Sequence, residues 1–477
     1  MQRWALLPVA RRAVGIDGGF AGLEVLAGYL LQIGHARIFS RQCADTINGR
    51  SNAFVIRKCL PNGASRPGEN MKSCLLACGI LSLSAAAFAA PDKNLLALAE
   101  AHKPAFIEEL KTLVNIDSGT DDAKGLGQVE QLLATRLKEL GANVDILAAP
   151  PAAGKVVVGT LEGSGTKSFM LMIHYDTVFS PGDAAKRPFR MDGNKAYGPG
   201  VADAKGGAAM IIHGLQMLKE RSNRQYKRIT VVFNPDEEKS SLGSRAVITR
   251  LAPDHDYVFS YEPPEKENVA VATNGIAYVH LNVKGKASHA GSAPEQGRNA
   301  AIELANQLVQ LKDLGNPAKG TTVNWTVLQS GEKVNIIPDS AKATADMRMS
   351  DLTEIERVQR DASAIVQKKL IPETEVTVRV ENRRPPFSKN PASDKLATVA
   401  QTIYQELGQS LTPVSMRFGT DAGFAYQGNG KPAVLETMGI VGERIHSADE
   451  FADLDSIVPR LYLTVRMIET LSQSVPD

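Results

Sequence analysis

The sequence predicts an α/β protein with a mixed sheet and helices on both of its faces, interrupted by a ferredoxin-like α+β domain. Two observations lead to this fold class. Short apolar or β-branched runs alternate with helically spaced segments in the first and last parts of the chain, as in layered α/β proteins. Between these parts the order becomes β-α-β-β-α-β, which suits a four-stranded antiparallel sheet with two helices on one face.

The bulk composition is that of a globular protein with two or three domains. The chain has 477 residues, of which 43% are hydrophobic and 22% charged. These values are near the average and argue against wholesale disorder and fibrous repeats. The 54 basic and 52 acidic residues leave a formal charge of +2, which offers no electrostatic footprint for nucleic acid. No nucleic-acid partner is therefore expected, and function has to be inferred from local groups of residues.

Residues 71–89 have the features of a secretory signal peptide. A lysine follows Met71, an apolar stretch too short for a confident membrane span comes next, and a small-x-small sequence ends at Ala89. We predict cleavage near Ala89, export to the periplasm or the medium, and no membrane span in the mature form. Residues 1–70 are predicted to be a non-native upstream extension. A long targeting extension and a buried helix at Leu75–Leu83 are the alternatives.

The cysteines agree with this processing. All of them precede the predicted cleavage site, namely Cys43, Cys59, Cys74 and Cys78. The mature chain would therefore contain neither disulfides nor cysteine metal ligands. A lipoprotein attached through Cys78 is disfavoured, because the apolar stretch before that cysteine is too short.

The catalytic domain is predicted to comprise residues 90–274 and 387–477. Helical spacing of apolar residues predicts helices over Asn94–Asn115, Gln128–Leu140, Ala204–Leu218 and Leu454–Leu471. Continuous apolar or β-branched runs predict strands over Lys155–Leu161, Ser168–His174, Arg228–Asn234 and Tyr257–Tyr261. Such runs, without alternation, are typical of strands covered on both faces.

The inserted domain is predicted to comprise residues 275–386. Its predicted strands are Ile276–Val283, Thr322–Gln329, Ala341–Met349 and Glu375–Val380. Its predicted helices are Arg298–Leu314 and Leu352–Leu370. Proline-rich punctuation near Pro386 then returns the chain to the catalytic domain.

Histidine or acidic residues follow the ends of three predicted catalytic strands, where α/β proteins place their ligands. In chain order they are His174 with Asp176, Glu237 with Glu238, and Glu262. In His-x-Asp the two side chains point the same way, so Asp176 can hold the ring nitrogen of His174 that faces away from a metal. A structural histidine or a solvated acidic loop would explain any one of these. Three consecutive strands with such ends favour a site.

A glycine-rich turn from Gly198 to Gly207 opens a predicted helix and contains Asp203. An ordinary helix cap with an ion pair to Lys205 is the plain alternative. The turn has more glycine than a cap needs, which favours a close approach of the backbone to a site.

Together these motifs resemble the co-catalytic dizinc amidohydrolase and peptidase family, which includes carboxypeptidase G (glutamate carboxypeptidase), aminoacylase, acetylornithine deacetylase and carnosinase. The resemblance runs from about Ala90 to the C-terminus. The stretches that carry it are H-x-D, G-x-G-x-x-D-x-K-G-G, D-E-E, Y-E-P, G-K-A-S-H-A-G, N-x-I-P and a late I-H-S. The stretches G-P-G-V-A-D-x-K-G-G, F-N-x-D-E-E-K and G-I-A-Y-V resemble bacterial carboxypeptidase G in particular.

The resemblance implies two zinc ions per chain. Asp203 would bridge them, Glu238 and His446 would complete one position, and His174 and Glu262 the other. Two imidazoles and three carboxylates form a coherent ligand set for zinc. A bridging carboxylate also lets two cations lower the pKa of a shared water.

The resemblance also assigns the acid and base groups. Glu237 would be the general base, taking the proton of the water and passing it to the leaving amine. Asp176 would orient His174. Ala204 replaces a second acid common after the bridging aspartate, which should be harmless because that acid is not a ligand in the family. Charged residues within 442–445, just before His446, depart from the carboxypeptidase G pattern and leave substrate detail open.

For the inserted domain the resemblance implies a homodimer. His289 would reach the active site of the partner subunit and polarise the scissile carbonyl. Asn335 and Arg348 would bind the backbone and the free carboxylate of the substrate, a task that suits a planar guanidinium. Gly419 and Thr420 would line the pocket.

The expected activity is that of an exported zinc carboxypeptidase that releases a C-terminal glutamate or similar residue from N-acylated substrates, such as folates or small peptides. An aminoacylase or dipeptidase of the same family is the nearest alternative. A catalytically inactive binding module is disfavoured, because all five ligand positions and Glu237 are competent. A serine hydrolase is disfavoured because the mature sequence has no G-x-S-x-G.

Overall fold

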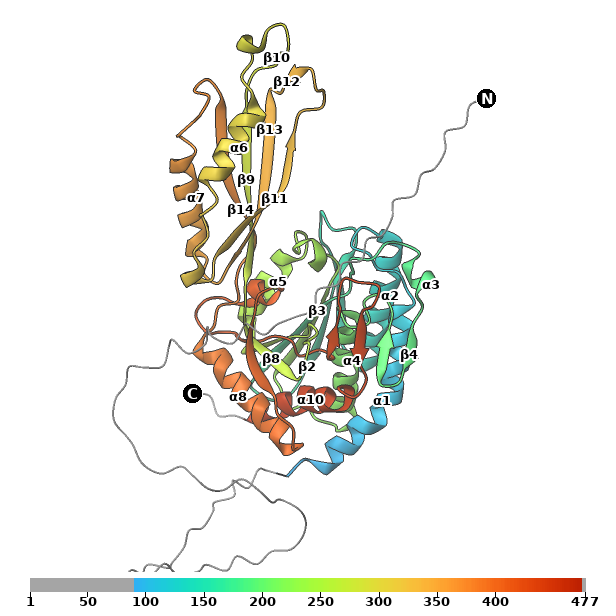
Figure 1. Cartoon of the computed structure of the whole chain (residues 1–477). Helices are drawn as coiled ribbons and strands as arrows, with labels where there is room; N and C mark the ends of the chain where they lie inside the picture. The colour runs from blue at the N-terminus through green and yellow to red at the C-terminus, as the bar shows by residue number, and fades with distance from the viewer. Residues whose placement is uncertain (1–89, 474–477) are drawn as a thin grey trace, which may run out of the picture. The chain divides into compact units, whose positions relative to one another are not determined.

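A computed structural model describes residues 90–473 of the chain (Figure 1). The predictions for residues 1–70 and 71–89, including the signal peptide and the cysteines, lie outside these residues. Among the helices of the described range, none is both long and apolar enough to cross a membrane.

Six strands of the described range form a central mixed sheet in the order β1-β2-β6-β3-β7-β16. They are β1 (Asn143–Ala148), β2 (Lys155–Glu162), β3 (Ser168–His174), β6 (Arg228–Asn234), β7 (Tyr257–Ser260) and β16 (Ala433–Leu435). The four strands from β6 to β16 are parallel, and β1 and β2 are antiparallel to their neighbours. The predicted mixed sheet is confirmed.

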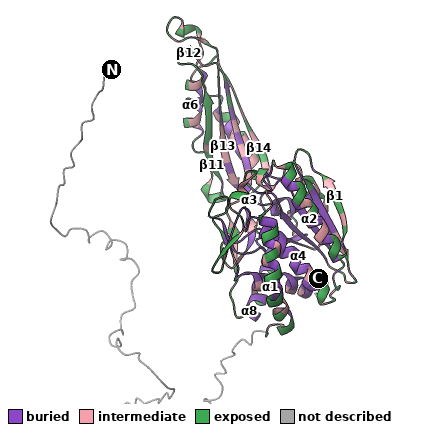
Figure 2. Cartoon of the chain, turned by 90° about the vertical axis from the view of Figure 1, so that its right-hand side faces the viewer, coloured by how far each residue is buried: buried purple, intermediate pink, exposed green. Residues whose placement is uncertain are grey.

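The side chains of β3 show that helices cover both faces of this sheet. Phe169, Leu171 and Ile173 join one buried core, whereas Met170 and Met172 join another. The helices of the first core are α1 (Lys93–Val114), α2 (Ala123–Leu140), α4 (Lys205–Glu220), α8 (Pro391–Glu406) and α10 (Ile457–Gln473). Those of the second are α5 (Arg245–Leu251) and α9 (Ala422–Ala425). Most of α4 is buried, whereas α1 has an exposed outer side (Figure 2).

The remaining elements of this part were not predicted individually. They include α3 (Asp183–Lys186), α8 (Pro391–Glu406), and the parallel pair β8 (Asn268–Thr273) and β15 (Thr412–Met416). A small sheet in the order β17-β18-β5-β4 is built from β4 (Arg190–Asp192), β5 (Lys195–Tyr197), β17 (Gly442–Glu443) and β18 (Phe451–Asp453). The loop between β17 and β18 carries His446.

Four strands within residues 275–384 form a second, fully antiparallel sheet in the order β11-β13-β9-β14. They are β9 (Gly275–Lys284), β11 (Thr322–Ser330), β13 (Ser340–Met349) and β14 (Glu375–Arg384). This is the predicted ferredoxin-like order. A short pair at one end consists of β10 (Ser288–His289) and β12 (Ile336–Ile337).

Helices α6 (Ala300–Gln310) and α7 (Thr353–Ile365) pack on one face of this second sheet (Figure 1). Both are shorter than predicted. The start of α6 is fixed by Asn299, whose side chain accepts hydrogen bonds from the N–H groups of Ala301 and Ile302. This cap sets the start of α6 two residues after the predicted one, and at the other end the helix stops at Gln310, with Leu311 as its C-cap.

Candidate active site

The candidate site lies at the carboxyl ends of β3, β6 and β7. His174 is the last residue of β3, Glu262 follows β7, and Glu237 and Glu238 lie in a 3-10 turn after β6. Because these strands are parallel and adjacent, their ends meet at one edge of the sheet. Asp203 joins them from the turn before α4.

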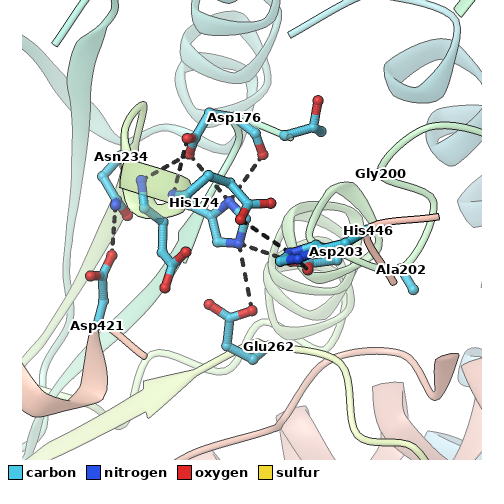
Figure 3. Close-up of polar contacts among 12 residues, drawn as sticks. His174, Asp176, Gly200, Ala202, Asp203, Asn234, Glu262, Asp421 and His446 are labelled. Carbon is cyan, nitrogen blue, oxygen red and sulfur yellow. Dashed lines mark hydrogen bonds and ion pairs between the residues drawn. The ribbon is translucent and has the colours of Figure 1, made fainter. Parts of the chain in front are cut away.

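The first group of possible metal ligands is His174, Asp203 and Glu262, all of them buried (Figure 3). The Nε2 atom of His174 lies 3.0 Å from Oδ1 of Asp203 and 3.5 Å from Oε2 of Glu262. One imidazole nitrogen and two carboxylate oxygens therefore converge on one small volume.

The second group is Asp203, Glu238 and His446. The Nε2 atom of His446 lies 3.1 Å from Oδ2 of Asp203 and 3.1 Å from Oε2 of Glu238. Asp203 thus offers Oδ1 to the first group and Oδ2 to the second, which is the geometry that a bridging carboxylate requires. The side chain of His446 is 52% exposed, so this side of the site is open to solvent.

Asp176 organises the middle of the site. Its carboxylate lies 3.3 Å from Nδ1 of His174 and accepts hydrogen bonds from the N–H groups of Glu237 at 3.0 Å and Glu238 at 3.2 Å. The hydroxyl of Thr120 donates to it at 2.7 Å. Asp176 therefore directs Nε2 of His174 toward Asp203 and fixes the turn that carries both glutamates.

Glu237 is held by Arg384, the last residue of β14. The guanidinium of Arg384 is paired with the Glu237 carboxylate and donates to its main-chain oxygen at 2.8 Å. It also donates to the carbonyl oxygen of Gly419 at 2.7 Å and lies 3.6 Å from the Asp421 carboxylate. The inserted segment thereby contacts the predicted general base directly.

The electrostatics of the cluster favour a bound cation. Burial raises the pKa of Glu237 well above its usual value, although Arg384 opposes this shift. Burial and the charge of Asp203 raise the pKa of Glu238 to about 7, and burial also raises the pKa of Glu262. Buried carboxylates that resist ionisation gain most from a neighbouring positive charge.

The donor atoms suit zinc. The two groups offer imidazole nitrogens and carboxylate oxygens, which zinc accepts. Among the described residues, the buried Oε1 atom of Glu238 has no hydrogen-bond partner, so a ligand oxygen remains available beside His446. The residues present therefore fit two zinc positions that share Asp203.

The predicted substrate-binding residues are not gathered in this cluster. Arg348 makes a bidentate pair with Asp346 at 2.8 and 2.9 Å. The hydroxyl of Thr420 donates inward to Glu436 at 2.9 Å. Asn335 is exposed. A role in substrate binding stays a prediction for each of these residues.

His289 is exposed at the β10–β12 end of the inserted segment. Its Nδ1 atom accepts hydrogen bonds from the N–H groups of Gly291 and Ser292, both at 3.1 Å. In the neutral ring this fixes the proton on Nε2. The Nε2–H group is then the donor that the ring offers. Gly419 packs against Asn274 and Ile276, and its carbonyl oxygen accepts a hydrogen bond from Arg384 at the edge of the site.

Sequence reasoning missed Thr120, Arg384 and Glu450. Glu450 accepts backbone hydrogen bonds from the turn that carries Asp203. The available signals were weak: a doubled arginine before two prolines marks Arg384, and Glu450 follows His446 by four residues. Neither pattern identifies a contact partner.

Comparison with known proteins agrees with this site. Residues 170–470 match the model of peptidase family M20/M25/M40. The chain is 42% identical over 386 residues to carboxypeptidase G2 of Pseudomonas sp. (strain RS-16), covering 80% of this chain and 92% of that protein. It is 28% identical over 395 residues to acetylornithine deacetylase of Proteus mirabilis (strain HI4320), covering 77% of this chain and 96% of that protein.

Solved structures share the fold. Aminopeptidase PepT from Bacillus cereus ATCC 10987 matches with a TM-score of 0.67 at 22% identity, covering 78% of this chain and 99% of that one. The M20 family metallo-carboxypeptidase Sso-CP2 from Sulfolobus solfataricus matches with a TM-score of 0.62 at 15% identity, covering 77% and 99%. The family resemblance seen in the sequence is confirmed: the chain belongs to the M20/M25/M40 peptidase family and is a zinc metallopeptidase.

Proposed function

We propose that this chain is an exported carboxypeptidase with two zinc ions, which hydrolyses the amide bond to a C-terminal glutamate or similar residue in N-acylated substrates. Folates and small peptides are the substrate classes considered. The observation that carries the zinc centre is Asp203, whose two oxygens face two separate ligand groups. The identity to carboxypeptidase G2 supports the choice of a carboxypeptidase within the family.

The protein groups divide the work as follows. Glu237 takes the proton of the attacking water and delivers it to the leaving amine nitrogen. Its position beside Glu238 suits this role, because Glu238 is directed to His446 while Glu237 has no ligand partner. Asp176 holds both the ring of His174 and the turn of the two glutamates. When bound, two zinc ions would lower the pKa of a shared water and polarise the scissile carbonyl.

Arg384 fixes the position of the Glu237 carboxylate before substrate binds. Its guanidinium holds the carboxylate until water and substrate enter, so the base is kept in place without being a ligand. The pair is buried, with 3% of the Arg384 side chain and 11% of the Glu237 side chain exposed. Water is thus largely excluded around the proton acceptor.

The inserted domain completes the proposal. We assign His289 to the active site of the partner subunit in a homodimer, where Nε2–H would donate to the oxygen of the scissile carbonyl. The hydrogen bonds that fix its tautomer support this assignment. Asn335 and Arg348 are proposed to bind the substrate backbone and the terminal carboxylate, for which Arg348 must leave Asp346.

A substrate panel tests the activity. Purified zinc-loaded protein is incubated with a folate-like aroyl-glutamate, N-acyl-aspartate, N-acyl-leucine, N-acetylornithine and an unblocked dipeptide, and the released amino acid is quantified. We expect kcat/KM to be highest for the aroyl-glutamate. Glu237→Gln protein is the control for contaminating hydrolases.

Two outcomes would change the assignment. Preference for N-acyl-leucine or the unblocked dipeptide would make the chain an aminoacylase or dipeptidase. Preference for N-acetylornithine would follow the acetylornithine deacetylase likeness instead. Export is tested separately, because N-terminal sequencing of the secreted protein should give a start near Ala90.

A further inference from the structure

We propose that Glu450 is a positioning residue that ties the loop of His446 to the turn of Asp203, and so controls the affinity of one zinc position more strongly than that of the other. The inference rests on the proposed dinuclear centre. Neither the ligand groups nor the sequence motifs include Glu450.

The carboxylate of Glu450 collects backbone N–H groups. It accepts hydrogen bonds from Gly200 at 3.0 Å, Ala202 at 2.9 Å and Asp203 at 3.0 Å. The residue is 1% exposed, so water cannot replace it as an acceptor for these groups. Leaving buried N–H groups without an acceptor is unfavourable, which ties the shape of the turn to Glu450.

The turn itself leaves little freedom for an alternative. Gly200 has a φ of +73°, and a Cβ atom there would lie 2.6 Å from Cγ2 of Thr177. This backbone, which only glycine adopts easily, brings the N–H groups of the turn toward one point. Figure 3 shows Gly200 and Ala202 beside Asp203 and His446.

Glu450 also belongs to the hairpin that presents His446. It immediately precedes β18, and β18 pairs with β17 on the other side of the loop. The hairpin lies directly on the turn, because a Cβ atom on Gly442 would lie 2.3 Å from Cβ of Ala202. His446 has a φ of +62° and is exposed, so the fixed ends of the hairpin determine where its ring lies.

The two zinc positions differ in this dependence. His174 and Glu262 follow strands of the central sheet, and Asp176 fixes the ring of His174. Glu238 is held by the same aspartate through its N–H group. Within residues 90–473, no group fixes the ring of His446 as Asp176 fixes that of His174, so its place depends on the hairpin. Asp203 is shared by both positions and is itself held by Glu450. Losing Glu450 should therefore weaken both positions, and that of Glu238 and His446 more strongly.

Zinc titration of the full chain tests this. Metal-free wild type and Glu450→Ala are titrated against a chromophoric chelator that resolves two binding steps, and His446→Ala identifies the step of its own position. We expect that step to weaken about 10–100-fold in Glu450→Ala, the usual effect of losing a group that orients a ligand. The other step should weaken less, by up to about threefold, since among its ligands His174 and Glu262 keep their supports and Asp203 alone loses one.

A conservative variant separates positioning from folding. Glu450→Gln keeps one acceptor oxygen, which can still receive the N–H groups of Ala202 and Asp203, because both bonds go to Oε1. Its loss of affinity should lie between those of wild type and Glu450→Ala. This variant also keeps the test decisive if Glu450→Ala folds poorly.

Two controls match the change. Glu443→Ala removes an exposed carboxylate from the same hairpin and should leave both steps unchanged. Glu303→Ala removes a buried carboxylate that accepts the Ile371 N–H at 2.6 Å in the inserted segment. It should lower stability without changing either step.

The contrary outcomes are distinct. If Glu450→Ala leaves both binding steps unchanged, or weakens both to the same extent, the proposed role of Glu450 is wrong. The proposal of a dinuclear centre is not affected by this outcome. A wild-type chain that binds a single zinc ion would overturn the dinuclear centre, and this inference with it.

Discussion

The central sheet and the inserted sheet hold their candidate site residues in opposite ways. On the central sheet, His174 and Asp176 are buried and linked to further site residues. On the inserted segment, His289 and Asn335 are exposed, and the guanidinium of Arg348 is paired with Asp346, two residues away. The residues of the central sheet already contact the other members of the candidate metal site. These three residues of the inserted segment do not contact that site within the described part of one chain.

The sheet architectures explain this difference. Parallel strands covered on both faces bring their carboxyl ends to one protected edge, where second-layer residues can fix each side chain. The antiparallel sheet is covered by α6 and α7 on one face only, and its outer strand β11 is largely exposed. Its residues are therefore available to a second chain or a substrate.

The largest expected effect is on the central sheet. Glu237→Gln should retain both zinc ions but lower kcat by about 10²–10⁴-fold, the usual contribution of a general base. Glu238→Gln should lose zinc instead, because Glu238 belongs to a ligand group. Metal analysis and steady-state kinetics on the same preparations distinguish the two.

Equal zinc depletion in the two variants would contradict the separate roles. The central sheet would then hold a ligand cluster without a dedicated base. The central sheet could then no longer be contrasted with the inserted sheet as the part that carries the general base.

The next effect tests the inserted segment. His289→Ala and Glu237→Ala chains should each be inactive as homodimers, since one lacks the carbonyl donor and the other the base. A mixed dimer contains one complete site. With random exchange of subunits, two-fold symmetry predicts recovery of about a quarter of wild-type activity after co-refolding.

Tagged chains confirm by pull-down that mixed dimers have formed. If such dimers are present and remain inactive, His289 does not act across an interface. The exposed residues of the inserted segment would then serve their own chain or none.

A smaller effect is expected for Arg348. Arg348→Ala should raise KM for an aroyl-glutamate about 10–100-fold, as for a lost charge-assisted bidentate pair, with less change in kcat. Arg379→Ala is the matched control, because Arg379 is an exposed arginine on β14 that faces the same side of this sheet. Equal effects of both variants would show general attraction of an anionic substrate and no specific contact.

The smallest effect concerns stability alone and returns to the central part. His213 of α4 is 3% exposed, and its Nδ1 atom lies 3.2 Å from Nδ1 of His102. Burial, with smaller effects of His102 and Arg136, lowers the pKa of His213 from 6.5 to about 4. The unfolded chain therefore binds the extra proton between these pH values, and stability falls as the pH falls from 6.5 to 4.

Urea unfolding of wild type and His213→Gln from pH 4 to pH 7 measures this effect. The stability of wild type relative to the variant should decline by up to roughly 3 kcal/mol across that window. A difference between the two curves that stays constant with pH would show that folding does not lower the pKa of His213.

The elements that were predicted well have patterns within their own sequence. The uninterrupted apolar run before His174 gives β3 with the predicted ends, and the alternating side chains of β9 give the first strand of the insert. The strand β1 was missed because Asp145 interrupts its apolar residues and because it lies, mostly exposed, at the edge of the sheet. The prediction for α6 was too long at both ends, because apolar spacing indicates neither the N-cap at Asn299 nor the C-cap at Leu311.

The same distinction holds for the site residues: those within local sequence motifs were predicted, and those brought in by distant contacts were missed. The ligand groups contain the residues that the family motifs indicated. Most of these motifs follow a strand or open a helix, whereas His446 lies in the loop between β17 and β18. Arg384 and Glu450 were missed, since their partners lie 147 and about 250 residues away along the chain. Such contacts depend on the assembled fold, and no spacing rule within a short segment indicates them.

The contact between Arg384 and Glu237 limits how this protein can be recombined with its relatives. The inserted domain, predicted as residues 275–386, would be a natural unit to exchange with a relative. A graft cut at these borders would take residue 384 from the donor protein, although this residue lies directly against Glu237. A working chimera has to keep the native arginine, so the transplantable unit ends before the last residues of β14.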